Sequence, residues 1–263
     1  RFMSRLSSAF ENKKAFIPFI TAGDPDLETT KQLVLALEQA GADLIEIGIP
    51  FSDPVAEGPV IQEADYRALV GGVTTDMIFG MVEEIRKESG IPLAFMTYAN
   101  PIYTYGTERF MSNCKKVGID AVIVPDIPFE ERQEIKPYCD KYDITLISMI
   151  APTSKERIRM IASQAEGFIY CVSSLGVTGV RDKIGSDVED MIRQVKEVKD
   201  IPCAIGFGVS TPRQARELSA ISDGVIVGSA IVKIIAEHGK DCIPYVVSFV
   251  GKMKGAMTGC HQM

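Results

Sequence analysis

The 263-residue sequence predicts one α/β domain, a (β/α)8 barrel over residues 1–263 with an extra N-terminal helix and a closing C-terminal helix. Short apolar runs rich in β-branched residues alternate eight times with longer stretches of helical period. Eight such units in about 250 residues are typical of this barrel. An open, doubly wound sheet is the alternative, which is disfavoured because no G-x-G-x-x-G segment follows the first strand.

The strands are expected where the apolar runs are continuous, because parallel strands covered by helices are apolar on both faces. Runs such as "AVIV" and "GVIVG" have this character. The predicted strands are Phe16–Thr21, Leu44–Ile49, Pro92–Thr97, Ala121–Val124, Thr145–Met149, Phe168–Val172, Cys203–Phe207 and Gly224–Val227.

Helices are expected between the strands, where apolar residues recur at intervals of three and four. Leu33, Val34 and Leu37 share one helical face, and Gly41 follows at a position where helices often end. The other predicted helices include residues 77–85 and 191–198, an extra helix over Met3–Asn12 below the barrel, and a closing helix over Cys242–Lys254.

The composition excludes several classes of function. Acidic residues outnumber basic ones by 35 to 28, so the net charge is −7 and no basic stripe is available for nucleic acid. The longest uncharged window, Ser89–Thr107, is interrupted by prolines and glycines and does not read as a membrane span. No signal-peptide pattern opens the sequence, and the six cysteines lack the short spacings of zinc and redox motifs. We therefore expect a cytoplasmic protein with reduced thiols, no nucleic-acid partner and no membrane contact.

The first candidate catalytic residue is a glutamate inside a predicted strand, because barrels of this class carry their chemistry at the carboxyl ends of the strands. Glu46, in "LIEIGIP", shares the inward face with Leu44 and Gly48. A carboxyl buried there has a raised pKa, which suits proton transfer near neutral pH. A buried ion pair is the alternative, but no predicted strand contains arginine or lysine. Gly48 is expected to leave room for a ligand, whereas acids that precede strands, such as Asp43 and Asp223, are expected to be structural.

Two long segments follow predicted strands at this active end. The first, "PFSDPVAEGPVIQ", reads as a loop carrying Asp53, Glu57 and Gly58, and Glu57 is a second candidate carboxylate. The second, "SSLGVTGVRDKIGSD", contains three glycines, and a mobile lid is expected there. Long loops at this face are often functional, and ordinary solvated loops are the alternative.

Glycine turns follow the last two predicted strands. "GFGVSTP" contains Gly206 and Gly208, and "GSAIVK" places Gly228 and Ser229 before a helix expected to start near Ala230. Backbone N–H groups in such turns approach an anion closely, and barrels often bind phosphate at this position. The two turns together predict a phosphate site, with tight turns that bind nothing as the alternative.

The residue types available exclude several reactions of phosphorylated substrates. Schiff-base aldol cleavage needs a lysine at a strand end, and no predicted strand has one. The two histidines, His238 and His261, lie too late in the chain for a metal-dependent aldolase or a histidine-assisted isomerase. Carboxylate acid–base chemistry without a metal remains. It can break a carbon–carbon bond when the substrate supplies the electron sink, as an indole ring does once C3 is protonated.

Six ordered segments resemble the tryptophan synthase α-subunit family. The resemblance covers nearly the whole chain, and the segment around Glu46 is the most specific, whereas the glycine turns are shared with other phosphate-binding barrels. The segments are "PFITAGDP" (Pro18–Pro25), "LIEIGIPFSDPVAEGP" (Leu44–Pro59), "MTYANP" (Met96–Pro101), "SSLGVTG" (Ser173–Gly179), "GFGVSTP" (Gly206–Pro212) and "VGSAIV" (Val227–Val232).

The resemblance implies cleavage of indole-3-glycerol phosphate to indole and glyceraldehyde 3-phosphate. Glu46 matches the catalytic glutamate, which would relay protons between the C3′ hydroxyl and indole C3. Glu57 falls where the family often has an aspartate that holds the indole N–H, and Tyr170 matches a tyrosine that assists. Thr178 and Gly179 match the closing loop. The matching indole-pocket residues are Phe19, Met96, Tyr98, Ile123, Phe207 and Ile226, and the matching phosphate contacts are Gly179, Gly208, Gly228 and Ser229.

The resemblance also implies an αββα complex with a pyridoxal-phosphate β subunit, reached by indole through a tunnel. The α chain itself would carry no cofactor and no metal. Asp53 matches a loop position that faces the partner and the lid. Two other interpretations stay open: a barrel that mainly activates its β partner and turns over weakly, and another phosphate-binding barrel lyase or isomerase.

Overall fold

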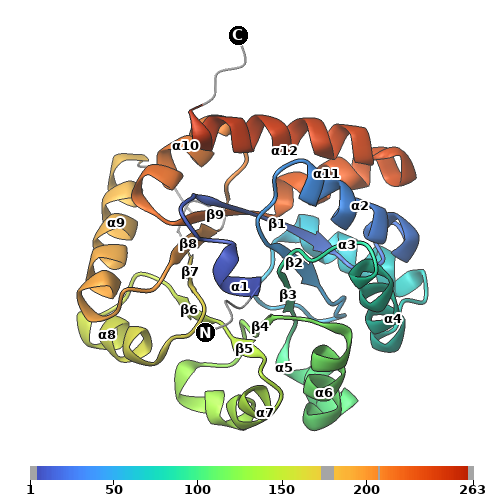
Figure 1. The fold of residues 1–263 in the computed structure, drawn as a ribbon, viewed down its shortest axis with the longest axis horizontal. Helices are drawn as coiled ribbons and strands as arrows, with labels where there is room; N and C mark the ends of the chain where they lie inside the picture. Colours follow the sequence, from blue (N-terminus) through green and yellow to red (C-terminus); the bar gives the residue numbers. More distant parts are fainter. Residues whose placement is uncertain (1–4, 173–180, 207, 260–263) are drawn as a thin grey trace.

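The strands form a ring surrounded by helices, which Figure 1 shows nearly end-on. The computed structural model describes residues 5–172, 181–206 and 208–259. All strand pairs are parallel, in the order β5-β4-β3-β2-β1-β9-β8-β7-β6. The strands are β1 (Ala15–Thr21), β2 (Ile45–Gly48), β3 (Leu93–Met96), β4 (Ala121–Ile123), β5 (Thr145–Leu146), β6 (Ser148–Ile150), β7 (Ile169–Val172), β8 (Cys203–Gly206) and β9 (Gly224–Val227).

The predicted fifth strand is divided into β5 and β6 at Ile147. β5 pairs with β4, whereas β6 pairs with β7, so the two ends of the strand row are consecutive in the chain. The Ile147 N–H donates to the Val122 carbonyl at 2.9 Å and continues the pairing on the β4 side. One bent strand therefore brings the ring nearly to closure, and the predicted (β/α)8 class is confirmed.

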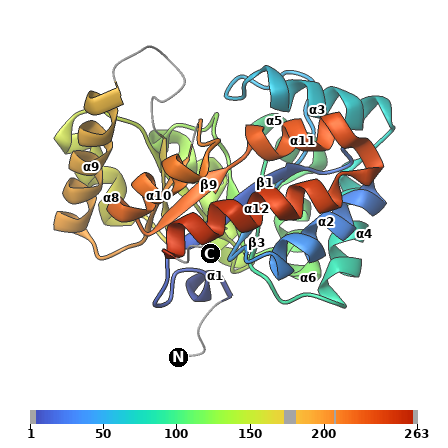
Figure 2. The same ribbon diagram turned by 90° about the horizontal axis from the view of Figure 1, so that it is seen from above.

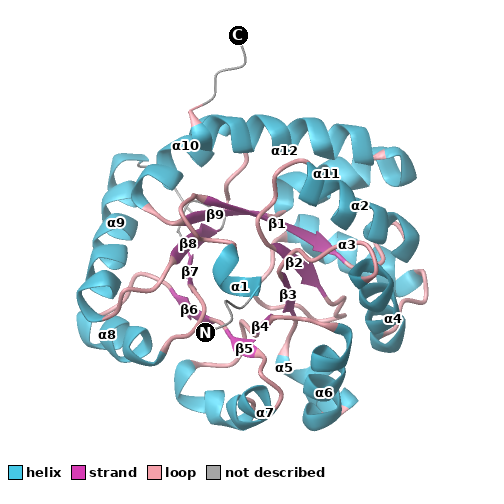
Figure 3. Ribbon diagram, in the orientation of Figure 1, coloured by secondary structure: helices cyan, strands magenta, loops and turns pink. Residues whose placement is uncertain are grey.

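The helices lie around the outside of the ring, except α1, which crosses one end of it, as Figures 2 and 3 show. Among the described residues, none of them is long and apolar enough to span a membrane. The α-helices are α1 (Arg5–Ser8), α2 (Leu27–Gln39), α3 (Pro59–Val70), α4 (Thr75–Arg86), α5 (Ala99–Tyr105), α6 (Thr107–Val117), α7 (Lys136–Lys141), α8 (Lys155–Gln164), α9 (Arg181–Val198), α10 (Pro212–Ile221), α11 (Ser229–His238) and α12 (Ile243–Thr258), and the short 3₁₀ helices are η1 (Phe129–Glu134) and η2 (Gly239–Asp241).

The segment after β2 is not one long loop. The loop ends at Gly58, and α3 starts at Pro59, where proline costs no helical hydrogen bond because the first N–H of a helix has no intrahelical partner. The prediction of a loop through Gln62 is therefore wrong in its second part. This correction places Glu57 directly in front of a helix.

The N-terminal helix is shorter than predicted. Its described part, α1, crosses the lower end of the ring and is followed by a turn in which Asn12 has φ +54°. Leu6 is buried in the inner core, and the Phe10 ring lies 5.3 Å from the Phe168 ring. A helix through Asn12 is thus contradicted because the chain turns to pack Phe10 inward, although the segment does cover the barrel bottom.

The lower end of the barrel is held by polar contacts at the starts of strands. Asp43 accepts a hydrogen bond from the Phe16 N–H at 2.8 Å and forms an ion pair with Lys254 of α12. Asp223 accepts from the Cys203 N–H at 2.8 Å. These acids are structural, as predicted, and α12 closes the fold over a slightly longer range than expected.

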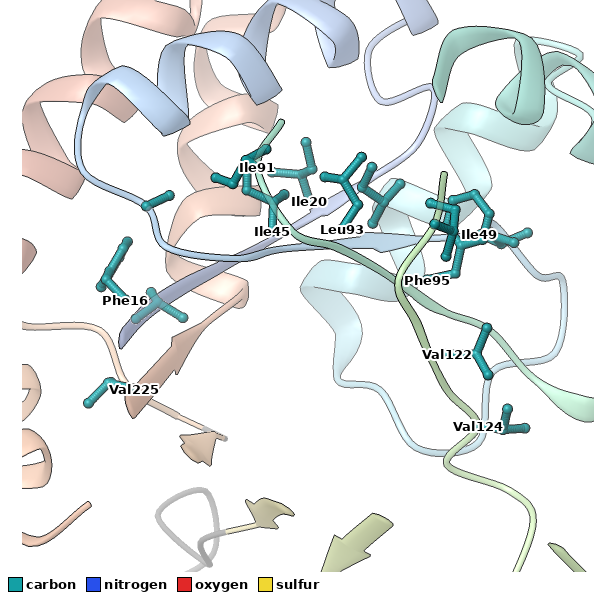
Figure 4. Packing of buried hydrophobic residues seen from close by; sticks show 14 of the residues in the cluster. Phe16, Ile20, Ile45, Ile49, Ile91, Leu93, Phe95, Val122, Val124 and Val225 are labelled. Atoms are coloured by element: carbon teal, nitrogen blue, oxygen red, sulfur yellow. The ribbon is translucent and has the colours of Figure 1, made fainter. Parts of the chain in front are cut away.

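Strand side chains alternate between two cores. Ile45 and Ile47 point outward into the large core under the helices, part of which Figure 4 shows, whereas Leu44 belongs to the inner core of the barrel. Glu46 lies between these isoleucines in sequence and therefore points inward. The predicted orientation of this strand is confirmed.

Candidate active site

A cavity of about 730 Å³ opens at the carboxyl ends of the strands. Its walls come from strand ends, from the loop before α3 and from the start of α11. Most of the predicted site residues within the described part of the chain line it. They are Phe19, Glu46, Glu57, Met96, Tyr170, Gly208, Ile226, Gly228 and Ser229.

Glu46 is a buried carboxyl that faces this cavity from the middle of β2. Its side chain has no exposed surface, and neither oxygen has a hydrogen-bond partner among the described residues. Burial raises the pKa of Glu46 from 4.5 to about 8, because an ionised carboxylate loses its hydration there. No salt bridge reaches it in the part of the chain described, so the ion-pair alternative has no support. Such a group can give and take a proton near neutral pH.

Tyr170 approaches Glu46 from the opposite side of the ring, on β7. Burial, and then the nearby Glu46 charge, raise the pKa of the Tyr170 phenol well above its ordinary value, so it stays a hydrogen-bond donor. Gly206 provides the space for it, since a Cβ there would lie 2.4 Å from the Tyr170 Oη. Gly206 therefore has a packing role, and the predicted close approach of its backbone to an anion stays a prediction.

The missing side chain of Gly48 also leaves space for a neighbouring side chain, and this space is not open to a ligand. A Cβ at this position would lie 2.5 Å from Cζ of Phe19. The prediction that Gly48 leaves room for a ligand is therefore wrong, because the Phe19 ring fills that space. Phe19 in turn forms the apolar cavity wall together with Ile61 of α3 and Met96 of β3.

Glu57 stands at the end of the loop that precedes α3. It is half-buried, and its Oε2 is buried without a hydrogen-bond partner among residues that the structure describes. The carboxyl of Asp65, on α3, lies against it and is only 3% exposed. Burial and the neighbouring carboxyl raise the pKa of Glu57 above its usual range, and burial does the same for Asp65.

Two predicted pocket residues lie behind the cavity wall. Tyr98 is 2% exposed, its Oη accepts a hydrogen bond from the Ala56 N–H at 3.0 Å, and its ring lies 5.4 Å from the Phe51 ring. Tyr98 thus supports the loop that carries Glu57. Ile123 is fully buried in the inner core. Their roles toward a ligand stay predictions.

The other end of the cavity is suited to an anion. Ser229 is the first residue of α11, so free N–H groups of the first helical turn lie at the cavity wall. Gly228 precedes it, and Gly208 adopts φ +78°, a backbone conformation that favours glycine. This arrangement fits the predicted phosphate contacts at Gly208, Gly228 and Ser229.

Several predicted residues cannot be placed in this arrangement. Thr178, Gly179 and Phe207 lie outside the described residues, as does the predicted lid as far as residue 180. The prediction of a loop over residues 181–187 is wrong, because α9 begins at Arg181. Asp53 is exposed and accepts a hydrogen bond from the Ser52 hydroxyl at 2.6 Å.

In the described part of the chain, no three His, Cys, Asp or Glu side chains are grouped to hold a metal ion.

Sequence reasoning missed one wall of the cavity. This wall comes from β6, from the segment between β4 and the end of η1, and from the segment between β6 and the start of α8, and most of its residues are apolar. Asp65 was missed as well, although recognition of the helical spacing of Ile61, Ala64 and Ala68 would have placed it on the inward face of α3. The unforeseen wall residues include Val124, Pro125, Ile127, Pro128, Phe129, Arg132, Met149, Pro152, Thr153 and Arg157.

Comparison with known proteins shows the family. The family model described as "Tryptophan synthase alpha chain" matches residues 6–258. Tryptophan synthase alpha chains from Thermoanaerobacter sp. (strain X514) and Lacticaseibacillus casei are 50% and 45% identical; the alignments cover 96% and 99% of this chain, and 99% and 98% of theirs.

Solved structures agree with the sequence comparison. Tryptophan synthase subunit alpha from Legionella pneumophila str. Paris superposes with a TM-score of 0.89 at 36% identity, covering 98% of this chain and 99% of that chain. A tryptophan synthase complex from Pyrococcus furiosus gives 0.84 at 37% identity, covering 92% and 99%. With a buried glutamate at the centre of a matching barrel, this chain belongs to the tryptophan synthase alpha chain family.

Proposed function

We propose that this chain cleaves indole-3-glycerol phosphate to indole and glyceraldehyde 3-phosphate, with Glu46 as the proton-transfer group. The reaction is the carbon–carbon lyase step of tryptophan biosynthesis, which belongs to the alpha chain of this family. The observation that carries the assignment of Glu46 is its buried carboxyl, which faces the cavity without a partner among the described residues.

The pKa of Glu46 suits the required order of proton transfers. Because burial raises this pKa to about 8, the carboxyl is mostly protonated at neutral pH and starts as an acid. It protonates indole C3, and the resulting carboxylate then takes the proton of the C3′ hydroxyl. The C3–C3′ bond breaks, its electron pair returns to the indole ring, and the former hydroxyl carbon becomes the aldehyde. Glu46 ends the cycle protonated.

The remaining residues bind and orient the substrate in this proposal. Glu57 accepts the indole N–H and stabilises the positive charge that develops on that nitrogen, and Tyr170 donates a hydrogen bond beside Glu46. The indole lies against Phe19, Met96, Phe207 and Ile226, with Tyr98 and Ile123 packed behind this wall. The phosphate binds at Gly179, Gly208, Gly228 and Ser229, and Thr178 belongs to the closing loop.

The chain works with a partner in this proposal. Tryptophan synthase alpha chains pair with a β subunit, which holds the pyridoxal phosphate, and one matching solved structure is described as a complex. Asp53 and the exposed Val55 lie on the loop that we assign to this contact. We place the protein in the cytoplasm, in keeping with a biosynthetic role and with free cysteines at all five described positions.

The test is the formation of indole by the variant Glu46→Gln, measured with the β subunit present. Turnover should fall by about 10²–10⁴-fold, the usual contribution of a general acid–base group. Binding of a non-cleavable analogue that lacks the C3′ hydroxyl should survive. The control is Glu83→Gln, which changes an exposed acid on α4 and should leave turnover unchanged. Retained turnover in Glu46→Gln would remove this residue from the reaction.

A further inference from the structure

Asp65 is a buried carboxyl that the reaction described above does not use. It lies on the inward face of α3 between the buried Ala64 and Ala68, and only 3% of its surface is exposed. Burial of a carboxyl without a partner is unfavourable, so its surroundings have to account for it.

Asp65 connects the two ends of the loop between β2 and α3. Its Oδ2 accepts a hydrogen bond from the Phe51 N–H, at the start of the loop, at 3.4 Å. Its carboxyl also contacts that of Glu57, at the end of the loop. Tyr98 holds the same loop by accepting the Ala56 N–H. The loop that carries Glu57 is therefore held at two backbone positions, Phe51 and Ala56.

The charges around the two carboxyls favour a shared proton. Among the described residues, neither carboxyl has a salt bridge, and Arg67, on the same helix as Asp65, is bound to both oxygens of Asp24 at 2.8 and 2.9 Å. The other titratable groups that face the pair, Asp24 and Tyr98, add no positive charge. Two carboxyls that are in contact and largely buried are not both ionised, so one proton lies between them.

The proton belongs mainly to Glu57. Asp65 accepts the Phe51 N–H, which favours its ionised form, while the nearby negative charge favours the protonated form of Glu57. The Glu57 hydroxyl then donates to Asp65. The other carboxyl oxygen stays an acceptor, and Glu57 is one of the residues that line the cavity.

We propose that Asp65 is a positioning residue, which binds the Glu57 carboxyl through this shared proton and directs its free oxygen at the indole N–H of the substrate. The inference rests on the proposed function, since it deepens the role of Glu57. It also gives the longer glutamate arm one defined geometry at a position where the family often has aspartate.

The experiment compares two non-cleavable analogues of the substrate, one with the indole N–H and one methylated at that nitrogen. The dissociation constant of the methylated analogue divided by that of the N–H analogue measures the N–H contact. This ratio is insensitive to a general loss of fold. Asp65→Ala should lower this ratio roughly five- to tenfold, as expected when one hydrogen bond loses its geometry. Glu63→Gln, an exposed acid on the same helix, is the matched control and should leave the ratio unchanged.

Asp65→Asn provides a second readout if the alanine variant does not fold. It keeps the size of the side chain but removes the charge, so the pKa of Glu57 should fall and the pH dependence of analogue binding should move to lower pH. An unchanged profile would contradict the shared proton.

Glu57→Ala separates this inference from the proposed function. Loss of the N–H preference in Glu57→Ala but not in Asp65→Ala would overturn the positioning role alone. If Glu57→Ala keeps both the preference and full turnover, the role of Glu57 fails and that of Asp65 fails with it, whereas the assignment of Glu46 still stands.

Discussion

Glu46 links catalysis to stability at the scale of a single residue. Its pKa is about 8 in the folded chain and 4.5 ordinarily. Between these values the folded protein holds a proton that the unfolded chain has released. The free energy of unfolding therefore falls as pH rises through this window, by at most about 1.4 kcal/mol per pH unit.

Glu46→Gln should remove this dependence, because the amide does not ionise. We expect urea unfolding at pH 5 and pH 8.5 to show the variant gaining stability relative to the parent chain at the higher pH. The control, Glu83→Gln, should follow the parent chain at both. Parallel curves for Glu46→Gln and its parent would mean that the buried carboxyl is not protonated in the folded state.

Gly206 supports Tyr170 by having no side chain. We predict that Gly206→Ala destabilises the protein by about 1–3 kcal/mol and reduces indole formation, because the new Cβ would displace the Tyr170 ring. The comparison is Gly80→Ala in α4, where no atom lies within 4 Å of the new Cβ and helix propensity favours alanine. Gly206→Ala should lower both the melting temperature and the rate of indole formation, whereas Gly80→Ala should lower neither. Equal behaviour of the two variants would contradict the packing argument.

Residue identity and strand alternation were enough to predict the inward orientation of Glu46. They were not enough for Gly48 and Gly206, because a sequence shows where a Cβ is missing but not which neighbour fills the space. The rings that fill it, Phe19 and Tyr170, come from other strands. Only the three-dimensional register of the barrel brings them together.

The N-terminus of α11 provides a prediction at the scale of an element. Ser229→Asp places a negative charge on the first helical turn, which stabilises a helix by about 0.3–1 kcal/mol. The same charge opposes a bound phosphate, so KM for indole-3-glycerol phosphate should rise at least about tenfold. Thr74→Asp, at the start of α4, should leave KM unchanged. An unchanged KM in Ser229→Asp would place the phosphate elsewhere.

Elements with a strong apolar pattern were predictable, and the remainder depended on context. The central strands match their predicted ranges to within one or two residues, because their apolar runs are continuous. The first turn of α3, Pro59–Gln62, belongs to the segment predicted as loop, because glycine and proline stand at its start, although proline is favourable at the first helical position. Missing that helix also meant missing Asp65, whose position depends on the helical turn.

At the scale of the whole molecule, the two ends of the barrel have different chemistry. The lower end is covered by α1 and held by paired acids such as Asp43, whereas Glu46 and Glu57 at the upper end have no cationic partner among the described residues. Stability and function are therefore carried by opposite ends of the same strands. That one domain spans residues 1–263 stays a prediction.

The fifth strand of the barrel is divided at Ile147, and this division is where the ring of strands closes. β5 and β6 contribute only two and three residues to the ring, and each pairs with a single neighbour. Residues 146–150 also border the cavity. A substrate bound in the cavity contacts residues on both sides of this division, so its binding opposes the separation of β5 from β6.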